Sequence, residues 1–231
     1  MDLPPLAPAS TPYGSDENGL ISGYRFVADQ GAQAIQSAEA LESISQAAQT
    51  GSAFVWLHFN LSHARAESWM QRHAGLPDDF FAALREGSRA SRIHRDENTV
   101  FAVINDVTFD FSFDAGDLAT LWVSVRPGLV VSARRHPLRG VDRLRAAVKR
   151  GERFESGIDL LDHLLRDQAD ELQAIVRKAS ERVDDIEDDL LARRADRGAA
   201  ELAQLRRLTV RLNRLMTPAP GALQRLLANP P

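Results

Sequence analysis

The stretch IDLLDHLLRDQADELQAIVRKASERVDDIEDDLLARRA, residues 158–195, decides the fold of the C-terminal part of the chain. It contains neither Pro nor Gly, and with one gap of seven its apolar residues recur at spacings of three and four, the period of one helix face. These apolar residues are Ile158, Leu161, Leu165, Leu172, Val176, Ala179, Val183, Ile186 and Leu190. One helix over this stretch would be about 57 Å long at 1.5 Å per residue. Because that exceeds the length of ordinary domain helices, we expect it to project from the domain or to pack along another long helix.

A second helical pattern follows directly. Gly198 interrupts the first pattern, and a leucine stripe then runs to Pro218 and Pro220, which stop it. The stripe consists of Leu202, Leu205, Leu208, Leu212 and Leu215. Two consecutive long helices joined by a short link predict an antiparallel helical hairpin. A short helix over 221–228 is expected after it.

The N-terminal half alternates strand and helix patterns. Strand patterns cover 20–28 and 53–59, and the second is a nearly continuous apolar run, as expected for a strand covered on both faces. A helix capped by Ser37 and ended by Gly51 is predicted between them. Two short helices are predicted to follow, at about 64–74 and 77–87.

Three consecutive strands are predicted next, at 98–111, 118–125 and 129–134. The last two are joined by Arg126-Pro-Gly128, a tight turn in which Gly128 supplies a positive φ. A helix from Pro137 to about Arg150 follows. Alternating elements followed by consecutive strands predict a mixed sheet with helices on its faces. The predicted fold class is therefore α/β: an α/β/α layered domain with a mixed sheet, followed by a long antiparallel helical hairpin.

The same patterns divide the chain. Residues 1–19 are rich in Pro and Gly and show no apolar period, so we expect a disordered leader. Residues 20–155 form the α/β/α domain in this interpretation. Residues 156–231 form the long hairpin and the short terminal helix.

Composition excludes several functional classes. Hydrophobic residues make up 44% and charged residues 26% of the 231, as in soluble globular proteins. The chain has no Cys, which excludes disulfide scaffolds and thiolate metal sites. A net charge of −4 argues against a nucleic-acid partner. Hydrolase, kinase and nucleotide-binding motifs are absent, so we expect no enzymatic activity and no organic cofactor.

Carboxylates cluster within nine residues of the long predicted helix. They are Glu181, Asp184, Asp185, Glu187, Asp188 and Asp189, and Asp167, Asp170 and Glu171 precede them. Asp184 and Asp188 lie one turn apart on one face. Carboxylate oxygens are preferred ligands of hard divalent cations. The alternative is a solvated helix face with ion pairs such as Arg177–Glu181. One helix rarely completes a coordination shell, so a metal site would need ligands from a neighbouring helix or subunit.

Basic residues and histidines give weaker signals. The basic run comprises Arg134, Arg135, Arg139, Arg143, Arg145, Lys149, Arg150 and Arg153. It indicates either a patch for an anionic partner or the solvent face of an amphipathic helix. Among the six histidines no pair has helical metal-ligand spacing, and His58, within an apolar strand, is expected to be structural.

Four ordered segments resemble the N-terminal cytosolic domain of the CorA family of divalent-cation transporters, and most of all its zinc-transporting ZntB-like branch. They are Val55-Trp-Leu-His-Phe59, Arg89–Arg95 leading into Val100–Val107, Val183-Asp-Asp-Ile-Glu-Asp-Asp-Leu-Leu191, and Leu205-Arg-Arg-Leu through Leu215-Met-Thr-Pro218 with Leu223–Leu227 behind it. The resemblance covers roughly residues 20–231 and implies the same α/β/α domain and helical hairpin.

The resemblance also implies a function. In such proteins five subunits form a funnel at the cytoplasmic face of the inner membrane, and carboxylates at subunit contacts bind zinc or magnesium. The candidate metal ligands here are Asp167, Asp170, Asp184, Glu187 and Asp188. The family continues into a stalk helix, a membrane span ending in Gly-Met-Asn and a second span, which lie outside these 231 residues; we expect this fragment to be soluble. The alternative function is a free-standing protein-interaction domain that uses its hairpin.

Overall fold

The computed structural model describes residues 14–28, 30–87, 91–96, 98–191 and 198–216, together with residue 224. The strands are β1 (Leu20–Val27), β2 (Gly31–Ile35), β3 (Ala53–Asn60), β4 (Arg92–Asp96), β5 (Thr99–Val107), β6 (Leu118–Arg126) and β7 (Leu129–Arg134). The helices are α1 (Ser37–Thr50), α2 (Ala66–His73), α3 (Asp78–Glu86), α4 (Arg139–Lys149), α5 (Gly157–Leu191) and α6 (Gly198–Met216), with a short 3-10 turn at Ala115–Asp117. The predicted fold class is confirmed.

All seven strands form one sheet, in the order β2-β1-β3-β7-β6-β5-β4. β3 and β7 run parallel in its centre, and the other neighbouring pairs run antiparallel. The sheet is therefore mixed, as predicted. The turn between β6 and β7 holds Gly128 at a φ of +76°, the positive value expected from the sequence.

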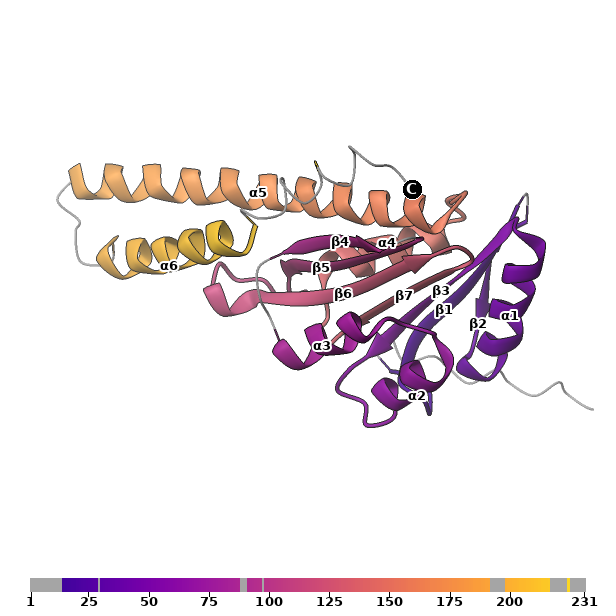
Figure 1. The fold of residues 1–231 in the computed structure, drawn as a ribbon. Coiled ribbons are helices and arrows are strands. Elements are labelled where there is room, and N and C mark those ends of the chain that lie inside the picture. The colour runs from indigo at the N-terminus through magenta and orange to yellow at the C-terminus, as the bar shows by residue number, and fades with distance from the viewer. Residues whose placement is uncertain are drawn as a thin grey trace, which may run out of the picture.

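Helices cover both faces of the sheet (Figure 1). α1, α2 and α3 pack on one face, around Leu57, Phe59 and Met70. α4 and the first part of α5 pack on the other face, around Trp56, Leu144 and Leu160. The central strands β3, β6 and β7 are thus buried on both sides, which explains their almost continuous apolar runs.

α5 is one uninterrupted helix of 35 residues. Figure 1 shows its second half continuing past the end of the sheet, with α6 running back beside it. A small cluster of Val107, Leu118, Ile175 and Leu208 joins this hairpin to the ends of β5 and β6. The predicted hairpin is confirmed, whereas the helix expected over 221–228 lies outside the described residues apart from residue 224.

Some local predictions were wrong. The edge strands β2 and β4 were not expected, because both are short and largely lack an apolar stripe. α1 begins at Ser37, so Ser37 is not its cap; the preceding Gln36 holds that position, and its backbone N–H donates to Glu39. Of the leader predicted over residues 1–19, residues 1–13 lie outside the described part. In the remainder, Asp16 accepts hydrogen bonds from the backbone N–H groups of Asn18, Leu20 and Ser37.

Candidate functional site

The five predicted metal ligands all lie on α5. Asp170, Asp184, Glu187 and Asp188 are exposed, and Asp167 is 26% exposed. Fourteen residues of helix separate Asp170 from Asp184, which is about 21 Å along the axis. A divalent cation holds its oxygen ligands at about 2.0–2.6 Å. The pair Asp167 and Asp170 therefore cannot share an ion with Asp184, Glu187 and Asp188 of the same chain. They form two separate acidic positions on the same helix.

Asp167 has a partner within the chain. The His163 ring lies between two carboxylates, with Nε2 3.5 Å from Asp167 and Nδ1 3.2 Å from Glu152. Over the described ranges of the chain, no group of three or more His, Asp or Glu side chains is arranged to hold a metal ion. A cation at the α5 carboxylates would therefore take part of its coordination shell from water or from another chain.

A buried ion cluster fixes α5 to α4 and had not been predicted as such. The Glu171 carboxylate is nearly buried and accepts hydrogen bonds from Arg139, at 2.7 Å, and from Arg143. Arg139 also donates to the backbone carbonyls of Phe109 and Phe111. One carboxylate thus joins α5, α4 and the loop after β5. A buried ion pair adds little net stability to a fold. Removing one partner is nevertheless strongly destabilising, because it leaves the other charge uncompensated.

A second buried carboxylate lies close by. Asp106, at the end of β5, accepts hydrogen bonds from the backbone N–H groups of Val107 and Gly140, at 2.7 and 2.8 Å. Burial raises the pKa of Asp106 to about 6, and the Glu171 charge adds to this, against the lowering effect of the two N–H donors and Arg143. Gln168 of α5 donates to the neighbouring carbonyl of Asn105. The first half of α5 is therefore held on the sheet by polar contacts as well as apolar ones.

The spacing of residues on α5 indicates that Glu171 lies on the buried face of the helix. Leu164, Gln168, Glu171 and Ile175 recur at i, i+4, i+7 and i+11, so the two polar residues continue the buried stripe. The sequence interpretation placed Glu171 with the acidic cluster, as either a possible cation ligand or part of a solvated helix face. Part of the basic run forms ion pairs within the chain, because Arg139 and Arg143 bind Glu171 and Arg145 binds Asp142.

His58 is buried, as predicted for a structural histidine, but only one of its nitrogens has a partner. Its Nδ1 lies 2.8 Å from Ser132 Oγ, which also accepts a hydrogen bond from the Trp56 indole N–H. Its Nε2 has no hydrogen-bond partner among the described residues. Burial, followed by the charges of Arg134 and Arg145, holds the pKa of His58 well below its usual value. The ring is therefore neutral in the folded protein.

This histidine gives a pH prediction. Below about pH 6.5 the unfolded chain protonates His58 and the folded chain does not, so stability is lost as pH falls. One titrating group can change the free energy of unfolding by at most about 1.4 kcal/mol per pH unit. We expect the free energy of unfolding, measured in urea between pH 6.5 and 5, to fall more steeply for the wild type than for His58→Asn. Replacement of the exposed His94 by Asn is the control; equal slopes for wild type and His58→Asn would refute the assignment.

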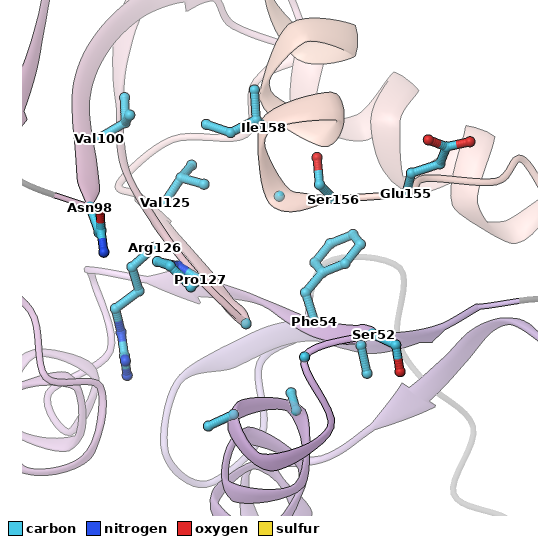
Figure 2. A pocket seen from close by; sticks show the side chains of 16 residues that line it. Ser52, Phe54, Asn98, Val100, Val125, Arg126, Pro127, Glu155, Ser156 and Ile158 are labelled. Atoms are coloured by element: carbon cyan, nitrogen blue, oxygen red, sulfur yellow. The ribbon is translucent and has the colours of Figure 1, made fainter. Parts of the chain in front are cut away.

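Two cavities complete the candidate sites. One of about 510 Å³ lies at the end of the sheet, between the last turn of α1, the β6–β7 turn and the start of α5. Figure 2 shows Phe54, Val125 and Ile158 around it. Polar side chains lie on both sides: Asn98 and Arg126 on one, and Ser52, Glu155 and Ser156 on the other. Burial lowers the pKa of Arg126, whose Nη2 donates to the Ala74 carbonyl. The other cavity, of about 710 Å³, is a groove between α5 and α6.

Comparison with known proteins decides the family. A family model described as "CorA-like Mg2+ transporter protein" matches residues 51–231, more than half of the chain. The chain belongs to the CorA-like family. The resemblance seen in the sequence is thus confirmed, and the match includes the central sheet, α4, α5 and α6.

Individual CorA-like relatives agree. The zinc transport protein ZntB of Pectobacterium atrosepticum is 24% identical over 172 residues, which is 74% of this chain and 52% of the relative. The divalent cation transporter CmaX of Pseudomonas aeruginosa is 23% identical over 209 residues, 88% of this chain and 60% of the relative. The chain thus spans between half and two thirds of the length of these curated relatives.

Solved CorA-like structures share the fold. Full-length CmaX superposes with a TM-score of 0.78 at 22% identity, over 92% of this chain and 64% of that one. The ZntB cytoplasmic domain from Vibrio parahaemolyticus gives 0.70 at 14% identity, over 91% and 80%. Within the residues that our structure describes, no helix combines the length and the apolarity that a membrane crossing requires.

Proposed function

We propose that this chain is the cytoplasmic part of a divalent-cation transporter and that the carboxylates of α5 bind the cation. The observation that carries the proposal is the position of Asp184, Glu187 and Asp188, all exposed on the half of α5 that projects past the sheet. Membership of the CorA-like family and the names of its relatives support the transporter function. In this proposal the chain is attached to the membrane through segments outside its 231 residues and catalyses no reaction.

The binding site is proposed to lie between copies of the chain. Asp184 and Asp188 lie one turn apart and can supply two oxygen ligands to one ion. Divalent cations such as Mg²⁺ take six ligands, so the remainder must be water or carboxylates of a neighbouring copy. A ring of five copies, which the family resemblance implies, would bring several α5 helices together. Asp167 and Asp170 would form a second acidic position about 21 Å from the first.

The donor set favours one ion class. The five candidate residues offer carboxylate oxygens alone, and the chain has no Cys. Oxygen ligands suit Mg²⁺, whereas Zn²⁺ prefers His and Cys. We therefore propose Mg²⁺ as the ion for the α5 carboxylates, with Zn²⁺, suggested by the ZntB relatives, as the second candidate.

Calorimetric titration of the full chain with Mg²⁺, and separately with Zn²⁺, tests the proposal. We expect saturable binding, weakened at least about tenfold by Asp184→Asn combined with Asp188→Asn, because two charged ligands are replaced by neutral ones. The matched control is Glu42→Gln combined with Glu67→Gln, which neutralises two exposed carboxylates on α1 and α2. Absence of binding of either ion to an oligomeric preparation, or equal binding by the α5 double variant, would overturn the proposed site.

A further inference from the structure

Phe113, in the loop between β5 and β6, has a backbone conformation that a bulky residue rarely adopts. Its φ is +67°, and every other positive φ among the described residues belongs to a glycine. A residue with a Cβ atom is crowded in this left-handed region, where Gly, Asn or Asp is usual. Such a conformation persists only where the surrounding contacts compensate for it, and it commonly marks a functional position. The contacts of Phe113 therefore indicate what the loop is built to do.

The carboxylate of Asp117 fixes this conformation. Its Oδ2 accepts hydrogen bonds from the backbone N–H groups of Ser112 and Asp114, at 2.7 and 3.3 Å, and from the Ser112 hydroxyl at 2.8 Å. The residues on both sides of Phe113 are thus bound to one oxygen atom, which closes the chain into a tight turn around Phe113. The short 3-10 turn that contains Asp117 also contacts α6. The loop is therefore held in one shape against the hairpin.

Phe113 contacts both helices of the hairpin. The guanidinium of Arg182, on α5, lies over its ring, with Cζ 4.1 Å from the ring centre. This distance is well within the range of a cation–π contact. The backbone carbonyl of Phe113 accepts a hydrogen bond of 3.3 Å from the Gln204 side chain, on α6. One residue of the loop therefore binds α5 through its ring and α6 through its main chain.

The partner of Arg182 is not the one that its sequence neighbours favour. Glu181, Asp184 and Asp185 all lie within three residues of it. Asp185 follows at i+3, a spacing at which opposite charges on a helix attract each other. Among the described residues Arg182 nevertheless forms no ion pair; it is half-buried at the ring, while the three carboxylates are exposed. The ring of Phe113 thus takes the place of a carboxylate as the partner of Arg182.

We propose that Phe113 is a positioning residue for the cation site of α5: it keeps the Arg182 guanidinium from pairing with the nearby carboxylates and so leaves them available to a divalent cation. This inference rests on the proposed function of those carboxylates. A guanidinium that moved to Asp185 would lie within one turn of Asp184 and Asp188. It would neutralise part of the charge that attracts the cation and would repel the cation directly.

Urea unfolding of the full chain in EDTA tests the contact in the absence of any cation. The double-mutant cycle combines Phe113→Leu with Arg182→Gln. We expect Phe113→Leu to lower the equilibrium constant for folding about threefold more in the wild type than in the Arg182→Gln background, as loss of a half-buried cation–π contact would. Phe113→Asn, which tolerates a positive φ, takes the place of Phe113→Leu if that variant does not fold. Equal losses in both backgrounds would overturn the contact, because the ring would then act by packing alone.

Calorimetric titration of the same variants with Mg²⁺ tests the consequence for the cation. We expect Phe113→Leu to raise the Kd about threefold, whereas Phe113→Tyr, which retains an aromatic ring, should keep the wild-type value. Arg182→Gln should bind Mg²⁺ at least as tightly as the wild type, and adding Phe113→Leu to it should cause no further loss. Phe109→Leu is the matched control: its ring lies in the same loop and is 50% exposed, and the Kd should not change.

The outcomes separate this inference from the proposed cation site. An unchanged Kd in Phe113→Leu, or a loss of affinity that persists without Arg182, would overturn the positioning role. If the wild type itself binds no Mg²⁺, the proposed site fails, and the metal-free cycle still decides whether Phe113 holds Arg182.

Discussion

Glu171→Ala is expected to lower the free energy of unfolding by about 3 kcal/mol, the lower end of the range for breaking a buried ion pair. The substitution leaves the guanidinium groups of Arg139 and Arg143 without the carboxylate that both bind. The effect is expected at the lower end because Arg139 and Arg143 are themselves partly exposed and can turn towards water. It should also loosen the loop at Phe109 and Phe111, whose carbonyls Arg139 holds.

Urea unfolding followed by circular dichroism measures this loss. Asp170→Ala is the control, because Asp170 precedes Glu171 on α5 and is exposed. We expect the control to change stability by less than about 0.5 kcal/mol, as exposed substitutions usually do. Equal effects of the two substitutions would show that the buried ion cluster does not hold α5 to α4.

Gly157→Val is expected to destabilise the protein by about 3 kcal/mol, the upper part of the usual range for overpacking a core. Gly157 is the first residue of α5 and lies directly on the sheet. A Cβ atom there would be 2.5 Å from Val130 Cγ2 and 3.0 Å from Val125 Cγ1. Since both neighbours sit in the packed core, the start of α5 would have to move away from the sheet.

Thermal and urea unfolding of a graded series test this close approach. Gly157→Ala should lie between wild type and Gly157→Val, because it adds the clashing Cβ without the two further methyl groups. Ala169→Val, at an exposed position of α5, controls for the effect of a β-branched residue in a helix. A stability of Gly157→Val within about 0.5 kcal/mol of Ala169→Val would contradict the packing described here.

The elements that the sequence predicted correctly are those with a strong local pattern. The long helix has an unbroken apolar period, and β6 and β7 are apolar runs around a Pro-Gly turn. The edge strands were missed because each is fixed by hairpin pairing with the adjacent strand rather than by an apolar pattern of its own. β4, with the sequence Arg-Ile-His-Arg-Asp, is a strand because it pairs with β5.

The candidate site was predictable to a lesser degree. The acidic positions on α5 can be read from spacing, because one helix carries them. The function of Glu171 cannot, since it depends on two arginines about 30 residues earlier that only the packing of α4 against α5 brings near. The exposure of Val176 could not be predicted either. The apolar residues of α5 have the same spacing whether or not a neighbour covers them.

The central claim is that this chain is part of a divalent-cation transporter. The most direct test is to sequence the source gene beyond the codon for Pro231. We expect the reading frame to continue through a long helix, an apolar span of about 20 residues ending in Gly-Met-Asn, as the family resemblance implies, and a second apolar span. A stop codon directly after Pro231 would contradict the transporter function, because no described helix of this chain can cross a membrane.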